Sequence, residues 1–262
     1  MEYAVETVDL TRTFGELTAV DGLSLKVRAG SLFGFLGPNG AGKSTTIKML
    51  TGLLSKTSGR ASILGFDIER EPLEFKRRIG VVPEELPLFD RLTGREYLTF
   101  VGRMYGMPKG DIRSRTGELL QVMELPGDRK KLIVDYSHGM KKKLAFSAAM
   151  IHEPRLIFLD EPFEGVDAIA SRLIKNLMST LLQRGVTIFL TSHILEIVER
   201  LCNDIAIIHR GRLVAQGSLD DLQRGIALRS GRDEERTVTL EEIFLDLVEH
   251  DESAKTTLSW LG

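Results

Sequence analysis

The sequence predicts an α/β fold with a mixed, mainly parallel core sheet, an N-terminal antiparallel β-subdomain and an inserted α-helical subdomain. Three observations predict this fold. Short apolar runs alternate with helical patterns in both halves of the chain, which is typical of a parallel sheet covered by helices. A glycine loop at residues 37–45 stands between a strand-like run and a helical pattern, with the spacing of phosphate-binding loops. Between residues 93 and 153 the pattern is helical throughout.

Composition and charge limit the classes of function. The chain of 262 residues has a formal net charge of -2, so it lacks the basic excess that indicates a nucleic-acid partner. Its one cysteine, Cys202, excludes an internal disulfide and is interpreted as a packing residue in an apolar helical pattern. The polar, acidic start predicts no signal peptide, and no apolar run approaches the roughly 18 residues of a membrane span. Work at a membrane would therefore require another chain to span it.

The N-terminal region alternates like short strands at residues 3–10 and 19–27. Phe14 lies between these two runs. Its ring is suited to stacking on an adenine, although the residues alone favour an ordinary surface or core phenylalanine equally well. The apolar run at residues 31–36 is predicted to be a strand that leads directly into the glycine loop.

The loop at residues 37–45 is predicted to bind phosphate. Its glycines allow a tight turn with backbone N–H groups directed at an anion, and the helix that follows adds the positive end of its dipole. Lys43 then reaches the terminal phosphates of a nucleotide, and the Ser44 hydroxyl is placed to ligate Mg²⁺. The predicted helix ends at Gly52.

The middle of the chain continues the α/β pattern and then becomes helical. The periodicity predicts strands at residues 61–67 and 79–83, and helices at residues 69–78, 111–124 and 141–152. Thr93 and Glu96 fit a capping box that begins a further helix. The lysines at positions 141–143 are interpreted as a solvated helix face.

The C-terminal half returns to alternating strands and helices. The periodicity predicts strands at residues 155–160 and 186–190, helices at 168–184 and 194–201, and a hairpin at 204–217. Two helical patches follow, separated by a charged loop at residues 229–236. The second patch starts with a capping box at Thr239 and Glu242.

Polar side chains stand where two of the buried strands end. Asp160 follows an apolar strand, as does the Mg²⁺-binding aspartate of phosphate-loop proteins. Glu161, one residue later, points elsewhere and is suited to accepting a proton from a water that attacks a γ-phosphate. His193 ends another strand and is placed to contact the same phosphate.

With these residues the sequence resembles the ATP-binding subunits of ABC transporters, from about residue 4 to residue 217. Residues 37–45 match Walker A, residues 156–161 match Walker B with its glutamate, and residues 191–193 match the switch-histidine segment. The resemblance implies catalytic roles for Lys43, Glu161 and His193, and Mg²⁺ ligation by Ser44, Asp160 and Glu84. It implies ATP contacts from Phe14, Val20, Gly37, Pro38, Asn39, Gly40, Ala41, Gly42, Lys43, Ser44 and Thr45.

A second part of the resemblance implies a dimer. Residues 136–140 stand where the family has Leu-Ser-Gly-Gly-Gln before a helix, and Asp167 stands at the D-loop position. In the family two copies pair head to tail around two ATP molecules, so each signature contacts the nucleotide of the other copy. The signature residues of this chain are Ser137, His138, Gly139 and Met140.

The sequence departs from the family pattern at three places. Glu84 stands where the family usually has the Q-loop glutamine, and residues 163–166 replace its Thr-Ser-Gly-Leu. His138 and Met140 replace Gly and Gln of the signature, while Ser137 and Gly139, which carry the phosphate contacts, are kept. Because Lys43, Asp160, Glu161 and His193 are all intact, we expect two active sites in a homodimer.

The resemblance also predicts the organisation of the chain. The ATP-binding core comprises residues 1–87 and 154–217, the helical subdomain residues 88–153, and the helical tail residues 218–262. The signature variant, the loop and residues 239–244 are most similar to bacterial exporter-type ATPases of the ABC-2 kind, including the Ecs-like group. Such a subunit drives a separate permease and lies on the cytoplasmic face of the cell membrane. Six apolar residues have two equally good interpretations: they line a groove for a permease helix, or they pack the core of the helical subdomain. These residues are Leu86, Leu88, Phe89, Leu92, Tyr97 and Phe100.

Two other hypotheses belong to different classes. A soluble ABC ATPase would serve a non-transport machine, but the long coiled-coil or zinc-bearing insertions of repair and chromosome proteins are not seen in the sequence, and translation factors usually carry two such units. Iron–sulfur assembly stays open as the alternative. A phosphate-loop kinase is disfavoured by residues 136–140 and by His193.

Overall fold

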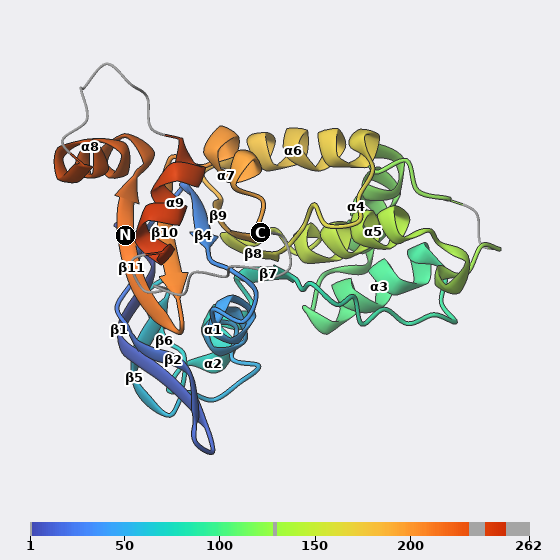
Figure 1. Ribbon diagram of the computed structural model, residues 1–262. Helices are drawn as coiled ribbons and strands as arrows, with labels where there is room; N and C mark the ends of the chain where they lie inside the picture. Colours follow the sequence, from blue (N-terminus) through green and yellow to red (C-terminus); the bar gives the residue numbers. More distant parts are fainter. Residues whose placement is uncertain (1, 128–129, 231–238, 250–262) are drawn as a thin grey trace, which may run out of the picture.

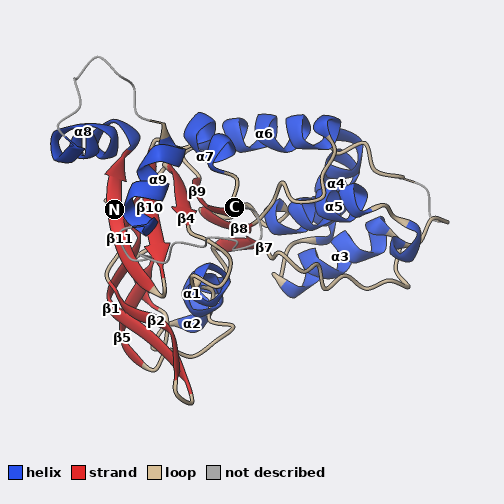
Figure 2. Cartoon of the chain, viewed as in Figure 1, coloured by secondary structure: helices blue, strands red, loops and turns tan. Residues whose placement is uncertain are grey.

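The computed structural model describes residues 2–127, 130–230 and 239–249 (Figure 1). Strands gather in one part of the molecule, and α3 (Gly94–Met104), α4 (Lys109–Val122) and α5 (His138–Met150) lie together beyond the edge of the sheet (Figure 2). This arrangement agrees with the predicted α/β fold class. Among the described residues, no helix is both long enough and apolar enough to cross a bilayer.

The central sheet is the mainly parallel one. Within the described residues its strand order is β11-β10-β4-β9-β8-β7, parallel from β10 to β7, with β11 antiparallel to β10. Every residue of β4, β8 and β9 is buried, which explains their almost continuous apolar sequences. The strands are β4 (Leu32–Leu36), β7 (Ile79–Val82), β8 (Leu156–Asp160), β9 (Thr187–Ser192), β10 (Asp204–His209) and β11 (Arg212–Ser218).

The N-terminal sheet is antiparallel, as predicted. Its strands are β1 (Tyr3–Phe14), β2 (Leu17–Leu23), β3 (Lys26–Arg28), β5 (Ser58–Ile63) and β6 (Phe66–Asp67). A buried apolar cluster extends from this sheet to the central one. In that cluster the rings of Phe33, Phe35 and Phe158 lie 5.5, 5.4 and 5.3 Å from the ring of Phe189. These four rings lie on strands of the central sheet and form its aromatic contribution to the cluster that joins the two sheets.

Local signals in the sequence set where several helices begin. The capping box of α3 is present, because the Glu96 N–H donates to Thr93 Oγ1 over 3.2 Å and the Thr93 N–H donates to Glu96 Oε2 over 2.9 Å. Thr239 and Glu242 exchange the same bonds over 3.2 and 3.4 Å. The remaining helices are α1 (Lys43–Leu50), α2 (Pro72–Lys76), α6 (Ala168–Gln183), α7 (Leu195–Leu201), α8 (Leu219–Ser230) and α9 (Leu240–Glu249), with a 3₁₀ turn at Ile133–Asp135.

Two predicted elements differ in the structure. The predicted strand at 19–27 is divided into β2 and β3, because the buried Thr7 hydroxyl donates to the Leu23 carbonyl and accepts from the Leu25 N–H. The helix predicted at 69–78 is shorter in the structure and corresponds to α2. Pro72 occupies its first turn, and the Asp67 carboxylate accepts from the N–H groups at positions 69 and 70, which therefore form a turn before the helix. Most of the predicted loop at 229–236 lies outside the described residues.

Candidate functional site

The glycine loop connects the buried strand β4 to α1, as predicted. Gly42 has a φ of 105°, and a Cβ atom there would lie 2.5 Å from the Ala19 carbonyl oxygen. A Cβ atom at Gly37 would lie 2.4 Å from the Ile208 carbonyl oxygen. Both distances are shorter than any real Cβ contact, so only glycine allows this close approach of three backbone segments.

Lys43 provides a fixed positive charge within this loop. Its side chain is 7% exposed, and the ammonium group donates to the carbonyl oxygens of Gly37 over 2.8 Å and Pro38 over 3.3 Å. It also lies 3.6 Å from Glu161 Oε1. The loop and the end of β8 are therefore brought together around one cation.

The end of β8 is held by a hydroxyl from the neighbouring strand β9. Thr191 Oγ1 donates to Asp160 Oδ1 over 2.5 Å and accepts from the Glu161 N–H over 3.1 Å. All three residues are buried. Glu161 has a φ of 46°, in the left-handed region that is costly for a side chain with Cβ. The backbone thus turns sharply between the two acids and points them in different directions.

The two carboxylate oxygens of Glu161 differ, because one accepts a hydrogen bond and the other does not. Glu161 Oε2 accepts from the His193 backbone N–H over 3.3 Å, and His193 Nδ1 lies 3.1 Å from the same oxygen. Glu161 Oε1 is buried and has no hydrogen-bond partner within the described part of the chain, apart from its ion pair with Lys43. A buried carboxylate oxygen in this situation is a fitting acceptor for a proton from a small polar molecule.

These groups face a cavity of about 540 Å³. The cavity is lined by Phe14, Leu17, Ala19, Pro38, Asn39, Gly40, Gly42, Lys43, Ser44, Thr45, Glu84, Glu161, Glu164 and His193. The Phe14 ring is 43% exposed at the end of β1, and the Arg12 guanidinium lies 4.4 Å from its centroid. An exposed aromatic ring and the phosphate loop therefore line the same cavity.

Three residues predicted to contact a nucleotide lie behind the residues that line this cavity. Val20, Gly37 and Ala41 are buried and do not line the cavity. Val20 Cγ2 lies 3.3 Å from the position of a Cβ atom on Gly42, so it supports the loop from behind. Leu17 and Ala19 of the same strand line the cavity in its place.

Hard oxygen atoms are present beside the phosphate loop. Ser44 Oγ lies 3.4 Å from Glu84 Oε2, and Asp160 is 4% exposed at the adjoining strand end. No cluster of three or more His, Cys, Asp or Glu side chains suited to a metal occurs among the described residues. A cation here would therefore take the hydroxyl and the carboxylates together with phosphate and water oxygens, which is how Mg²⁺ is usually held.

Besides Leu17 and Ala19, two further residues near the site were missed in the sequence. Lys142 was interpreted as part of a solvated face, and for this residue that interpretation is wrong: it is 2% exposed, and its ammonium donates to the Glu161 carbonyl over 3.0 Å. Burial lowers the pKa of Lys142, while the surrounding carboxylates act in the opposite direction. Glu164 lines the cavity but is exposed and carries no local motif. A lysine next to small apolar residues at helical spacing was the available signal for Lys142.

The signature and D-loop residues do not line the cavity of their own chain. Ser137 accepts from the Met140 N–H over 3.3 Å and caps α5, and Asp167 accepts from the Ala170 N–H over 2.8 Å and caps α6. A Cβ atom on Gly139 would lie 3.6 Å from Asp167 Oδ2. The signature segment and the D-loop segment therefore lie next to each other.

The apolar residues after Glu84 divide between two environments. Leu86, Leu88 and Tyr97 line a cavity of about 270 Å³ between β7, α3 and α5. Phe89 is 50% exposed and its ring lies 5.3 Å from the ring of Phe100, which is 41% exposed. Leu92 packs against the helical core, and its carbonyl accepts a hydrogen bond from the Ile133 N–H.

Cys202 is buried as predicted, and burial raises the pKa of its thiol to about 12.

Comparisons with known proteins agree with this geometry. A family model described as "ABC transporter" matches residues 20–164. The linearmycin resistance ATP-binding protein LnrL of Bacillus subtilis (strain 168) is 39% identical over 83% of this chain and 70% of its own. The Nod factor export ATP-binding protein I of Paraburkholderia xenovorans (strain LB400) is 39% identical over 83% and 71%. A solved ATP-binding subunit of an ABC transporter superposes with a TM-score of 0.84 at 32% identity, over 93% of this chain and 99% of the other.

Proposed function

The chain belongs to the ABC transporter family, and we propose that it is the ATPase subunit of an exporter whose membrane-spanning part is a separate permease. The family is one of ATP-hydrolysing subunits, and this chain is an ATPase of that type. Export is supported by the names of its relatives, which refer to linearmycin resistance and to Nod factor export. The soluble, non-transport alternative gains no support from these relatives.

The observation that carries the catalytic proposal is the buried Oε1 atom of Glu161, which faces Lys43 but accepts no hydrogen bond within the described part of the chain. We infer that it takes the proton from the water that attacks the γ-phosphate of ATP. Lys43, 3.6 Å away, stabilises the charge that develops on the phosphate oxygens. His193 holds Glu161 Oε2 through its backbone N–H, which keeps Oε1 directed into the cavity.

The residues beside the loop fit an accompanying Mg²⁺. Ser44, Glu84 and Asp160 would hold it, and when bound it neutralises phosphate charge during transfer. Glu84 places a carboxylate where most of the family has an amide, so this chain adds one negative charge beside the phosphates. The glycine N–H groups and Lys43 supply the opposing positive field.

We further propose a head-to-tail homodimer. The proposal is supported by the lining of the cavity, to which Ser137, His138, Gly139 and Met140 of the same chain do not contribute. Ser137 and the Gly139 backbone of a second copy would close it over the γ-phosphate, with Asp167 beside them. The dimer would close when ATP binds and reopen after hydrolysis, and this motion would transmit force to the permease.

The permease is proposed to dock at the 270 Å³ cavity beside Glu84. Leu86, Leu88 and Tyr97 form its apolar lining, and Phe89 and Phe100 extend an exposed aromatic surface from its edge. A short amphipathic helix of the permease would fit such a groove. The chain would then lie on the cytoplasmic face of the membrane without crossing it. Purification in detergent tests this point: recovery of a multi-span protein is expected, and soluble partners alone would contradict it.

The catalytic proposal is tested by comparing Glu161→Gln with wild type for ATP turnover and for size by light scattering. The amide keeps the shape but loses basicity, so turnover should stop while an ATP-bound dimer accumulates. Glu196→Gln, an exposed α7 residue without a contact to the cavity, is the matched control. Full turnover by Glu161→Gln would refute the role of Glu161. A variant that binds ATP but stays monomeric would refute the proposal that two copies of this chain close on ATP by themselves.

A further inference from the structure

A second and larger cavity lies at the opposite edge of the central sheet. Its volume is about 780 Å³, against 540 Å³ for the candidate ATP site. Thr187 at the start of β9 and Arg155 just before β8 line it, whereas the ATP site lies where these strands end. The helical side is formed by α4 and by the end of α5, and the other side by the end of α6. The two cavities are thus separated by the length of the strands.

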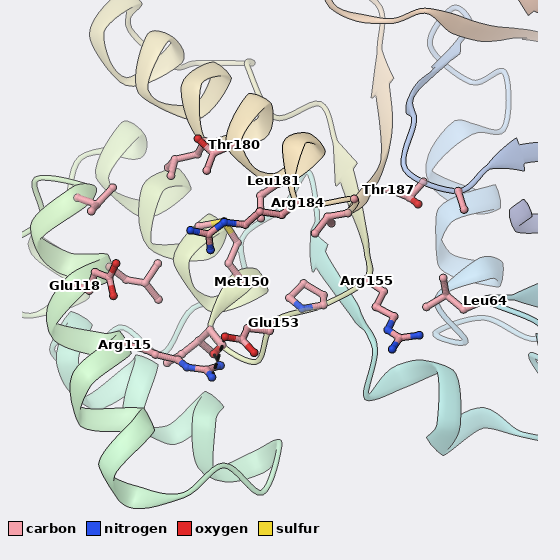
Figure 3. Close-up of a pocket in the computed structure, with 18 residues that line it drawn as sticks. Leu64, Arg115, Glu118, Met150, Glu153, Arg155, Thr180, Leu181, Arg184 and Thr187 are labelled. Carbon is pink, nitrogen blue, oxygen red and sulfur yellow. Dashed lines mark hydrogen bonds and ion pairs between the residues drawn. The ribbon is translucent and has the colours of Figure 1, made fainter. Parts of the chain in front are cut away.

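The lining of this cavity is mainly apolar. Figure 3 shows Glu118 and Arg115 on one side, Thr180, Leu181 and Arg184 on the other, and Met150 between them. The apolar part of the lining comprises Leu64, Leu119, Val122, Met150, Ile151, Leu177, Leu181 and Val186. Natural ligand sites combine this volume and apolar character with a few polar groups that orient the ligand.

The charged groups around the cavity leave one net positive charge, because three arginines and the two carboxylates of Glu118 and Glu153 line it. Arg115 is neutralised, since it lies 2.9 Å from Glu153 Oε1 and donates to the Ile151 carbonyl over 3.0 Å. Arg155 and Arg184 are exposed at the rim, and neither has a carboxylate within ion-pair distance in the described part of the chain. Arg184 and the apolar side chain of Met150 both line the cavity (Figure 3).

We propose that this cavity binds an amphiphilic organic anion. The apolar body would pack on Leu119, Met150 and Leu181, and the acidic group would pair with Arg184. A guanidinium is the side chain best suited to a carboxylate, sulfonate or phosphate group, because it offers a planar set of donors. Charge complementarity selects an anion over a cation, and the apolar lining selects an amphiphile over a fully hydrated ion such as free phosphate.

The binding probe is 8-anilinonaphthalene-1-sulfonate, whose fluorescence rises in apolar surroundings. It is titrated into the full chain in the presence of saturating ATP, which occupies the other cavity. The variant Arg184→Glu should bind the probe about tenfold more weakly, because one charge-assisted contact becomes repulsive. Thr180→Trp, which fills the cavity from α6, should weaken binding to a similar degree.

Arg172→Glu is the matched control, since it makes the same charge change on the exposed surface of α6 outside the cavity. The proposal is overturned if the cavity variants bind as wild type does, or if Arg172→Glu weakens binding as much as they do. Displacement of the probe by ATP would place it in the nucleotide site and would equally overturn the proposal.

A labelling experiment on the wild-type chain keeps the proposal testable if a variant fails to fold. A medium-chain fatty acid carrying a diazirine is photolysed with the protein, and the modified peptides are identified by mass spectrometry. Labels within residues 115–122, 150–155 or 177–187 are expected. Labels confined to the groove at residues 86–105 would refute the assignment. Neither experiment depends on ATP hydrolysis, so a failure here is distinct from a failure of the proposed export function.

Discussion

Replacing Lys142 with methionine is the sharpest test of how the catalytic strand end is held. The ammonium of Lys142 donates to the carbonyl of Glu161 over 3.0 Å, at a residue whose backbone is in the left-handed region. Methionine keeps an unbranched apolar chain of similar length but removes the donor. The Glu161 carbonyl then loses its charged partner in a buried setting, and the main effect is expected on the position of the carboxylate.

The magnitude follows from the kind of hydrogen bond that is lost. A bond from a charged donor is worth about 1.5–3 kcal/mol, and each ~1.4 kcal/mol of barrier is a factor of ten in rate. If this bond holds Glu161 in position, turnover should fall by roughly 10- to 100-fold. The free energy of unfolding should fall by only about 1 kcal/mol, because the variant no longer has to bury an ammonium group.

Steady-state ATPase rates and urea unfolding curves measure the two effects, with ATP affinity determined separately. Affinity should change little, because Lys142 does not line the cavity. Lys141→Met is the matched control: its neighbouring lysine makes only a 3.6 Å surface pair with Asp90 and should retain wild-type turnover. A folded Lys142→Met variant with turnover within about twofold of wild type would refute the positioning role, since the lost bond predicts a larger effect.

Two further predictions concern buried polar groups. Thr191→Val removes the donor to Asp160 and the acceptor for the Glu161 N–H, so the free energy of unfolding should fall by about 1–3 kcal/mol; turnover should fall as well, and an unchanged urea midpoint would contradict this. His152 donates to the Ile79 carbonyl over 2.8 Å, its Nδ1 is buried without a partner, and burial lowers its pKa to about 4. Because this folded-state pKa lies below the unfolded value of about 6.5, the contribution of neutral His152 to the free energy of unfolding is complete above pH 6.5. It is lost as the pH falls toward 4, by about 2.5 kcal/mol at pH 4.5. Urea curves of wild type and His152→Phe should therefore converge between pH 7 and pH 4.5, and a constant difference would refute the assignment.

Local spacing in the sequence was sufficient to predict much of the site. The loop at residues 37–45, Asp160, Glu161 and His193 each follow a strand, and parallel strands place their carboxyl ends at one edge of a sheet. Their proximity is therefore a consequence of chain order and handedness. The capping boxes at Thr93 and Thr239 were also readable, because each involves residues three positions apart.

Other features were decided only when distant segments met. Thr7 divides β2 from β3 because its hydroxyl meets a segment 16 residues away, and Lys142 is buried because α5 packs against the end of β8. The position of Val20 behind Gly42 depends on how two sheets stack.

The cavity near Arg155 and Arg184 depends most strongly on tertiary structure. It is formed by α4, α5, α6 and two strand starts that lie far apart in the chain, and no residue around it carries a recognisable motif. Sequence periodicity tells which face of each element is apolar, and only the packed arrangement determines where such faces fail to meet and leave a space.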